Sequence, residues 1–100
     1  MPDKLYEGAR TIDGCRVTVD GVLLDMAYDV ATLTTDGIEW SYEGDGPAQL
    51  ALGLLVDHLG DPQRAKALAD PFMRRVVANF NNDWEMRSAD LDRAIANITD

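Results

Sequence analysis

The chain has 100 residues, a length typical of one domain, so we expect a single domain over residues 1–100. Its formal net charge is −9, and a field of this sign repels phosphate backbones, which argues against direct nucleic-acid binding. No apolar run reaches the roughly 18 residues that a membrane-spanning helix needs. The single cysteine, Cys15, can form neither an internal disulfide nor a cysteine-based zinc site. We therefore expect a cytoplasmic protein that carries no cofactor and no metal.

The beginning of the chain has the pattern of short strands joined by tight turns. Residues 5–10 are typical of a strand, and Asp13–Gly14 predicts a turn after it. Residues 16–19 and 22–24 flank Asp20–Gly21, a residue pair that suits a two-residue type I′ turn. We expect a hairpin whose register brings four apolar side chains to one face, toward the core. These are Val17, Val19, Val22 and Leu24.

The following segment is ambiguous and then alternates. Residues 25–36 fit either a short helix or the edge of a loop, and Asp36–Gly37 predicts another turn. Residues 38–43 alternate between apolar and polar with a period of two, which predicts a strand. The side chains expected to face inward are Ile38, Trp40 and Tyr42.

The second half of the chain has the patterns of helices. Residues 44–47 break the strand and start a helix with Pro47 at its first position. Apolar residues cover about two thirds of this helix, which indicates a central helix packed on more than one side, and Gly60 ends it. Asp61 caps a second helix, in which Asp70–Pro71 predicts a kink or a junction between two abutting helices.

The end of the chain adds a short strand and a third helix. Residues 84–86 fit a strand, and Ser88 is a suitable N-cap for an amphipathic last helix. The predicted fold class is α+β. An antiparallel sheet of three to four strands from the N-terminal half is packed by the central helix and two further helices from the C-terminal half.

No residue of the chain is assigned a catalytic or metal-binding role. His58 is the only histidine and lies in the apolar arc of the central helix, where a packing role is favoured over ligation. Residues 43–47 form a glycine-rich turn before a helix but lack the lysine and hydroxyl of a phosphate-binding loop. Trp40, Tyr42 and Trp84 could form an aromatic cage, but the alternation of the first two favours the core.

The acidic residues are concentrated in the middle of the chain. Residues 17–63 contain nine acids and neither lysine nor arginine, which would attract a basic partner surface. Alternate residues of a strand lie about 6.6 Å apart, close to the spacing of phosphates along a nucleic-acid strand, so acids on a strand at 38–43 could act as a nucleic-acid mimic. The predicted partner-binding residues are Asp25, Asp29, Asp36, Glu39, Glu43 and Asp45.

Several motifs resemble a family of short prokaryotic and phage-borne proteins that is known only as a domain of unknown function. They are Tyr6, Gly8 and Arg10, then Val17, Val19, Gly21 and Leu24, then the stretch Gly37–Leu52 with Trp40, Tyr42, Gly44, Gly46 and Pro47. Members of that family often carry glycine at the position of Ser41 and serine at that of Asp45, so this copy is unusually acidic at the turn. The resemblance implies a small cytoplasmic accessory protein of mobile elements and implies no activity.

The leading hypothesis is a non-enzymatic protein that binds a basic protein surface. On a phage or mobile element, the natural target would be a nucleic-acid-handling defence complex, as for anti-CRISPR or anti-restriction inhibitors. The alternative is a structural or oligomerising domain whose acidity serves only solubility, and a homo-oligomer is compatible with the sequence. A third hypothesis is a small-molecule or cation-dependent enzyme with its site at the turn of residues 43–47.

Overall fold

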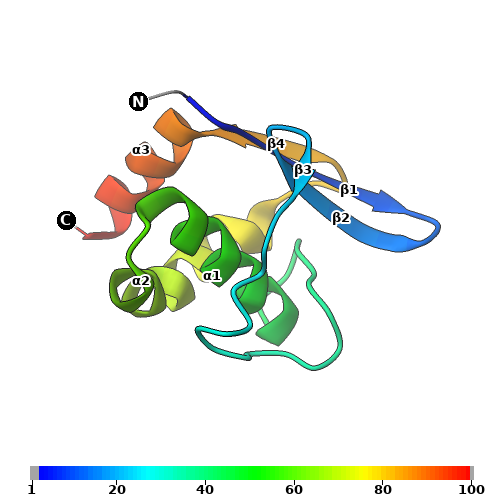
Figure 1. The fold of residues 1–100 in the computed structure, drawn as a ribbon, viewed down its shortest axis with the longest axis horizontal. Coiled ribbons are helices and arrows are strands. Elements are labelled where there is room, and N and C mark those ends of the chain that lie inside the picture. Colours follow the sequence, from blue (N-terminus) through cyan, green and yellow to red (C-terminus); the bar gives the residue numbers. More distant parts are fainter. Residues whose placement is uncertain (1–2, 100) are drawn as a thin grey trace.

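The fold combines one antiparallel sheet with three helices (Figure 1), as seen in a computed structural model that describes residues 3–99. The elements in chain order are β1 (Leu5–Thr11), β2 (Gly14–Val19), β3 (Val22–Leu23), α1 (Asp45–Leu59), α2 (Pro62–Arg75), the short 3₁₀ helix η1 (Val77–Asn79), β4 (Trp84–Arg87) and α3 (Ser88–Thr99). The helices gather on one side of the sheet. The predicted α+β fold is confirmed, with β4 supplied from near the end of the chain.

The sheet has the strand order β3-β2-β1-β4, with every neighbouring pair antiparallel. The β2–β3 hairpin turns at Asp20 and Gly21, whose φ angles of 50° and 84° are those of the predicted type I′ turn. The predicted register is also found, since Val19 pairs with Val22. The expectation that all four hairpin residues face the core is wrong for Val22, which is 69% exposed because no helix covers that corner of the sheet.

The core lies between the sheet and α1, which is the central helix that the sequence predicts. Most of the first ten residues of α1 are buried, including Leu50 and Leu54. Trp40 and Trp84 meet edge to face, with ring centroids 5.8 Å apart, and Phe80 stacks on Trp84 at 4.2 Å. The two tryptophans therefore belong to the core, as the favoured interpretation of the aromatic residues predicted.

The predicted strand at residues 38–43 is absent, and this is the main error of the sequence-based prediction. Residues 24–44 form one long connection without strand or helix, in which Ser41 has a φ of 79°. The backbone of this segment is bonded elsewhere: the Trp40 carbonyl accepts from Arg10, and the Ser41 N–H donates to the Val77 carbonyl. As a result Trp40 is buried, whereas Tyr42 is 51% exposed instead of facing inward.

The helix boundaries follow the predicted signals with small shifts. α1 begins two residues before Pro47, and it ends at Gly60, whose φ of 66° is left-handed. The Asp61 carboxylate caps α2 by accepting from the Arg64 N–H at 3.2 Å, and α2 continues through Pro71 as a single helix. Ser88 is the first residue of α3, and its hydroxyl accepts from the Lys4 N–H, which ties β1 to α3.

Within residues 3–99, no helix combines the length and the apolar character that crossing a membrane requires.

Candidate functional site

The connection between β3 and α1, residues 24–44, is the candidate site, and we call it the acidic loop. Five of the six predicted partner-binding residues lie in it, and the sixth, Asp45, is the first residue of α1. The loop contains no lysine or arginine. Connections of this length without secondary structure are uncommon in small domains and usually serve a function or are disordered. The contacts of the loop with the core distinguish between these two cases.

Gln49 of α1 holds the first half of the acidic loop. Its side chain is fully buried, an unusual place for a polar amide unless all its groups are bonded. The carbonyl oxygen accepts from the Leu33 N–H at 2.6 Å, and the NH₂ group donates to the carbonyls of Met26 at 2.7 Å and Ala31 at 3.1 Å. One side chain therefore supplies the hydrogen bonds that a strand partner would otherwise provide to this stretch.

Arg10 of β1 and the C-terminal end of η1 hold the second half of the loop. The Arg10 guanidinium donates to the Trp40 carbonyl at 2.8 Å and lies 5.0 Å from the centroid of the Trp40 ring. The Ser41 hydroxyl donates to the Phe80 carbonyl at 2.6 Å. Both halves of the acidic loop are thus anchored to the rest of the fold, so its outer surface has one defined shape.

The outer surface of the acidic loop combines carboxylates with exposed large side chains. Tyr28 is 45% exposed and Tyr42 is 51% exposed, together with Leu33 at 38%. A hollow of about 330 Å³ lies between the loop and the start of α1. The acids that line it are Asp36, Glu39 and Asp45. The structure therefore brings together three of the six predicted residues, while Asp25, Asp29 and Glu43 lie outside this hollow.

Two of the six acids form ion pairs with arginines from outside the acidic loop. The Arg10 guanidinium donates to Glu39 at 2.9 Å, and this hydrogen bond holds the pKa of the Glu39 carboxyl below its usual range. Arg74 of α2 contacts Glu43 at 2.6 Å. Among residues 3–99, no ion pair is found for Asp25, Asp29, Asp36 or Asp45, so these four carry the remaining charge of the loop surface.

The predicted row of phosphate-like charges is not formed. The spacing argument required Glu39 and Glu43 to project from one strand, but residues 38–43 are irregular and both acids are paired with arginines. Asp25 is also engaged locally, because its carboxylate accepts from the Ala27 N–H at 2.8 Å. Mimicry of a nucleic-acid backbone by strand spacing is therefore contradicted, whereas an acidic protein-binding surface is not.

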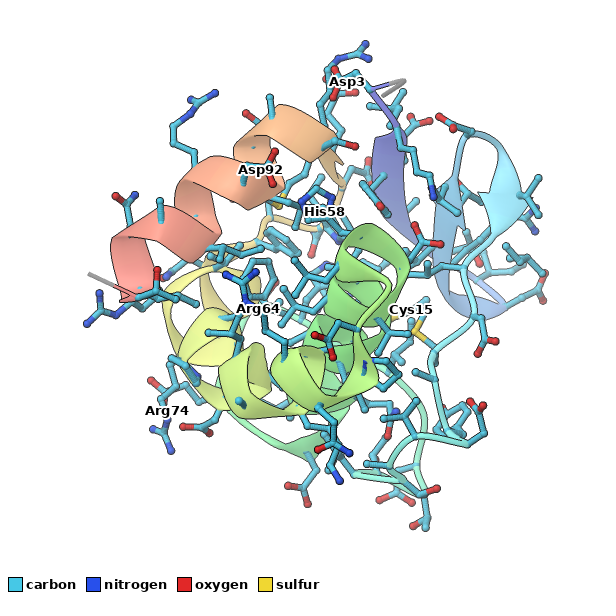
Figure 2. All side chains as sticks on the ribbon, turned by 60° about the vertical axis from the view of Figure 1, so that its left-hand side comes forward. Asp3, Cys15, His58, Arg64, Arg74 and Asp92 are labelled. Carbon is cyan, nitrogen blue, oxygen red and sulfur yellow. The ribbon has the colours of Figure 1, made fainter. Side chains whose placement is uncertain are left out.

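Sequence reasoning missed a polar cluster at the other end of α1, in a cleft of about 690 Å³ between α1, β1 and α3. The Tyr6 hydroxyl donates to the Asp57 carboxylate at 2.6 Å, and the Lys4 ammonium lies 3.3 Å from the same oxygen. His58 Nε2 lies 2.6 Å from Asp92 Oδ1 of α3 (Figure 2), and the His58 side chain is only 11% exposed. No local pattern signals these pairs, because each partner is more than 30 residues away along the chain.

Alkaline pH should weaken the fold through Tyr6. Burial, followed by the hydrogen bond to Asp57, raises the pKa of the Tyr6 phenol well above its ordinary value. The neutral phenol is thus favoured by folding. Its contribution is complete below about pH 10, the pKa of tyrosine in an unfolded chain, and is lost as the pH rises further. We expect the free energy of unfolding to fall by up to about 1.4 kcal/mol per pH unit above that point.

The Tyr6→Phe variant provides the comparison for this prediction. At neutral pH it should lose about 1 kcal/mol, the value of one hydrogen bond. Above about pH 10 its stability should fall less steeply than that of the wild type, because the phenol that must ionise is gone. Urea unfolding of both proteins across this range measures the difference, and parallel slopes would contradict the assignment to Tyr6.

The remaining candidates have little support as chemical centres. Within residues 3–99, no three His, Cys, Asp or Glu side chains are placed to hold a metal ion, and this includes the turn around Glu43. Burial, followed by the proximity of Glu39, raises the pKa of the Cys15 thiol, so Cys15 is less readily ionised to a nucleophilic thiolate than a free cysteine.

Comparison with known proteins places the chain in a family. No curated protein and no solved structure is detectably similar to it. A family profile described as "Family of unknown function (DUF6166)" matches residues 6–97, almost the whole chain. The chain belongs to this family of unknown function, DUF6166.

Proposed function

We propose that the protein binds a basic surface of a partner protein through the acidic loop and the adjoining Asp45. The observation that carries this proposal is the anchoring of a long irregular loop by a fully buried glutamine, Gln49, whose amide bonds three backbone groups of the loop. A loop held in one conformation loses little entropy on binding, so a preformed shape favours affinity. A solubilising surface would need no such anchoring.

The chemistry of the loop surface also fits protein recognition. Tyrosines are enriched at the centres of protein interfaces, and Tyr28 and Tyr42 each expose about half of their surface. The unpaired carboxylates of Asp29, Asp36 and Asp45 would steer a basic partner toward them. Part of the affinity should therefore depend on salt, while the tyrosine contacts should not.

The specific form of the proposal concerns the partner. We propose that the protein is a phage or mobile-element accessory protein that inhibits a nucleic-acid-handling defence complex, in the manner of an anti-CRISPR or anti-restriction protein. Such complexes present basic surfaces, to which the net charge of −9 is complementary. In this form the loop occupies the surface by protein contacts, without copying the spacing of phosphates.

Site-specific photo-crosslinking tests the proposal. Benzoylphenylalanine is introduced at Tyr28 or Tyr42, and at the exposed Lys66 of α2 or Ala96 of α3 as controls. In a lysate of cells that carry the gene, both loop positions should yield an adduct with the same basic protein, and the control positions should not.

The charge dependence of that adduct gives the second readout. Changing Asp29, Asp36 and Asp45 together to asparagine should reduce the yield several-fold, as should added salt. The matched change of three exposed acids, Glu7, Asp83 and Glu85, to their amides, on the side of the sheet where β1 pairs with β4, should leave it unaltered. Equal adducts from loop and control positions, or a yield that ignores charge, would refute the proposal.

A second function, an oligomerising domain, is favoured by one observation. Ile12 at the tip of the β1–β2 hairpin is 102% exposed, and Val22 and Leu23 at the sheet corner are 69% and 63% exposed. Exposed apolar residues at a sheet edge are typical of surfaces that pair with another chain. Light scattering decides between the functions: a stable dimer that Leu23→Lys converts to a monomer would favour oligomerisation.

A further inference from the structure

The strand β2 has a free edge next to the acidic loop. The Asp20 N–H donates to the Leu5 carbonyl at 2.8 Å. This bond identifies the residues of β2 whose N–H and C=O groups point toward β1. In an antiparallel pair these groups alternate along each strand. Those of Gly14, Arg16 and Thr18 therefore face β1, while those of Cys15, Val17 and Val19 face away from it.

β3 covers only one end of this edge. It has two residues, pairs with Thr18 and Val19, and then leaves the sheet. The last bond on this side is donated by the Leu24 N–H to the Val17 carbonyl at 3.0 Å. Among residues 3–99, the structure shows no hydrogen-bond partner for the Cys15 N–H, the Cys15 carbonyl or the Val17 N–H. Three peptide groups in a row thus point outward without a neighbour.

A groove runs along these unpaired groups. Two adjoining hollows of about 410 Å³ and 490 Å³ lie between β2 and the acidic loop. The residues common to both are Gly14, Cys15, Met26 and Ile38. Figure 2 shows Cys15 beside the loop, with its sulfur on this side of the sheet. The floor of the groove is therefore apolar, and one of its walls is a strand edge.

The charges around the groove are mainly negative. Asp13, Asp36 and Glu39 line it, although the charge of Glu39 is balanced by its ion pair with Arg10. The cation in the lining of the two hollows is Arg16, whose place in the register is opposite Ala9 on the outer face. Proteins usually protect exposed strand edges with lysine, proline or a covering segment. The stretch from Gly14 to Val17 has neither lysine nor proline. A basic segment would find both unpaired peptide groups and complementary charge here.

We propose that an extended basic segment of the partner adds to the sheet as a strand along Cys15–Val17, and this rests on the proposed function. Main-chain hydrogen bonds to the three unpaired groups fix its register, as in other strand-addition complexes. Alternate side chains of the added strand point to opposite faces, so apolar ones enter the groove over Met26 and Ile38 while basic ones reach Asp36 and Asp13.

The variant Cys15→Pro isolates the edge from the rest of the sheet. Proline removes the Cys15 N–H, which faces outward, so the β1–β2 ladder keeps all its bonds. Cys15→Ala is the matched control, since it removes the same thiol but keeps the N–H. A synthetic peptide that alternates lysine with valine serves as the probe, and the same peptide with alternate backbone amides methylated is its control.

Amide NMR of the protein at millimolar peptide gives the result. The lysine–valine peptide should shift the Cys15 and Val17 signals of the wild type and slow their exchange. It should bind Cys15→Ala as tightly as the wild type and Cys15→Pro about tenfold more weakly. The loss reflects one missing hydrogen bond and the steric conflict of the proline ring with the added strand. The methylated peptide should not bind. Because this comparison of the two peptides uses the wild-type protein, it tests the strand edge even if Cys15→Pro does not fold.

The remaining outcomes separate the two proposals. Equal binding of Cys15→Pro and Cys15→Ala, or shifts that avoid β2, would overturn strand addition. Crosslinks from Tyr28 that persist in Cys15→Pro would overturn it too, while leaving the acidic loop as the binding surface. If the wild-type loop gives no crosslinks in the lysate but the peptide still binds at Cys15, the proposed function alone would be refuted. A wild-type dimer that Cys15→Pro makes monomeric would identify a second copy as the occupant, against the proposal.

Discussion

Replacing Gln49 by methionine should lower the free energy of unfolding by about 3 kcal/mol and release the first half of the acidic loop. Methionine has nearly the volume of glutamine, so the packing around this fully buried position is kept and the loss is polar. The Leu33 N–H and the carbonyls of Met26 and Ala31 would lose their partner, and each unpaired buried group costs about 1–3 kcal/mol before the loop relaxes toward water.

Urea unfolding measures the loss of stability, and hydrogen exchange of the Leu33 amide measures the release of the loop. Gln63→Met, at an exposed position in the first turn of α2, is the matched control and should change stability by less than about 0.5 kcal/mol. The Gln49 variant should also give a weaker crosslink from Tyr28, because an unanchored loop must be ordered on binding. A stable variant with an unchanged Leu33 amide would show that Gln49 does not hold the loop.

The elements predicted correctly are those whose signals are local. Asp20 and Gly21 favour a type I′ turn whatever surrounds them, so the hairpin and its register follow from a few neighbouring residues. Gly60 ends α1 and Asp61 begins α2 because left-handed geometry and side-chain capping involve only residues within one turn. The apolar coverage of α1 likewise predicts its central place.

The acidic loop could not be predicted because its conformation is set by distant residues. Alternation at residues 38–43 is compatible with a strand, but a strand also needs a neighbour to pair with. Here Arg10, at the far end of β1, binds the Trp40 carbonyl, and Val77 binds the Ser41 N–H. The ion pairs of Glu39 and Glu43 could not be predicted for the same reason, since both arginines that pair with them lie outside the segment.

Gly8→Ala should be among the most destabilising single substitutions in the chain. A β-carbon at Gly8 would lie 2.2 Å from Nε1 and 2.3 Å from Cε2 of Trp84, distances that no real contact allows. The ring is not free to move aside, because it stacks on Phe80 at 4.2 Å and meets Trp40 edge to face at 5.8 Å. We expect a loss of about 3 kcal/mol, the upper part of the range for overpacking a core.

A double-mutant cycle with Trp84→Leu identifies the cause of that loss. Leucine has no atoms at the positions of Nε1, Cε2 and Cζ2 of the indole, so the β-carbon of Gly8→Ala would find room beside it. Trp84→Leu alone should be destabilising, since it leaves a cavity next to Trp40, but the double variant should be more stable than the sum of the two losses predicts. Additive losses in urea unfolding would mean that the contact with Trp84 does not determine the need for glycine. A favourable coupling would show that the pairing of β1 with β4 requires glycine at position 8, because the indole of Trp84 occupies the space that a side chain there would fill.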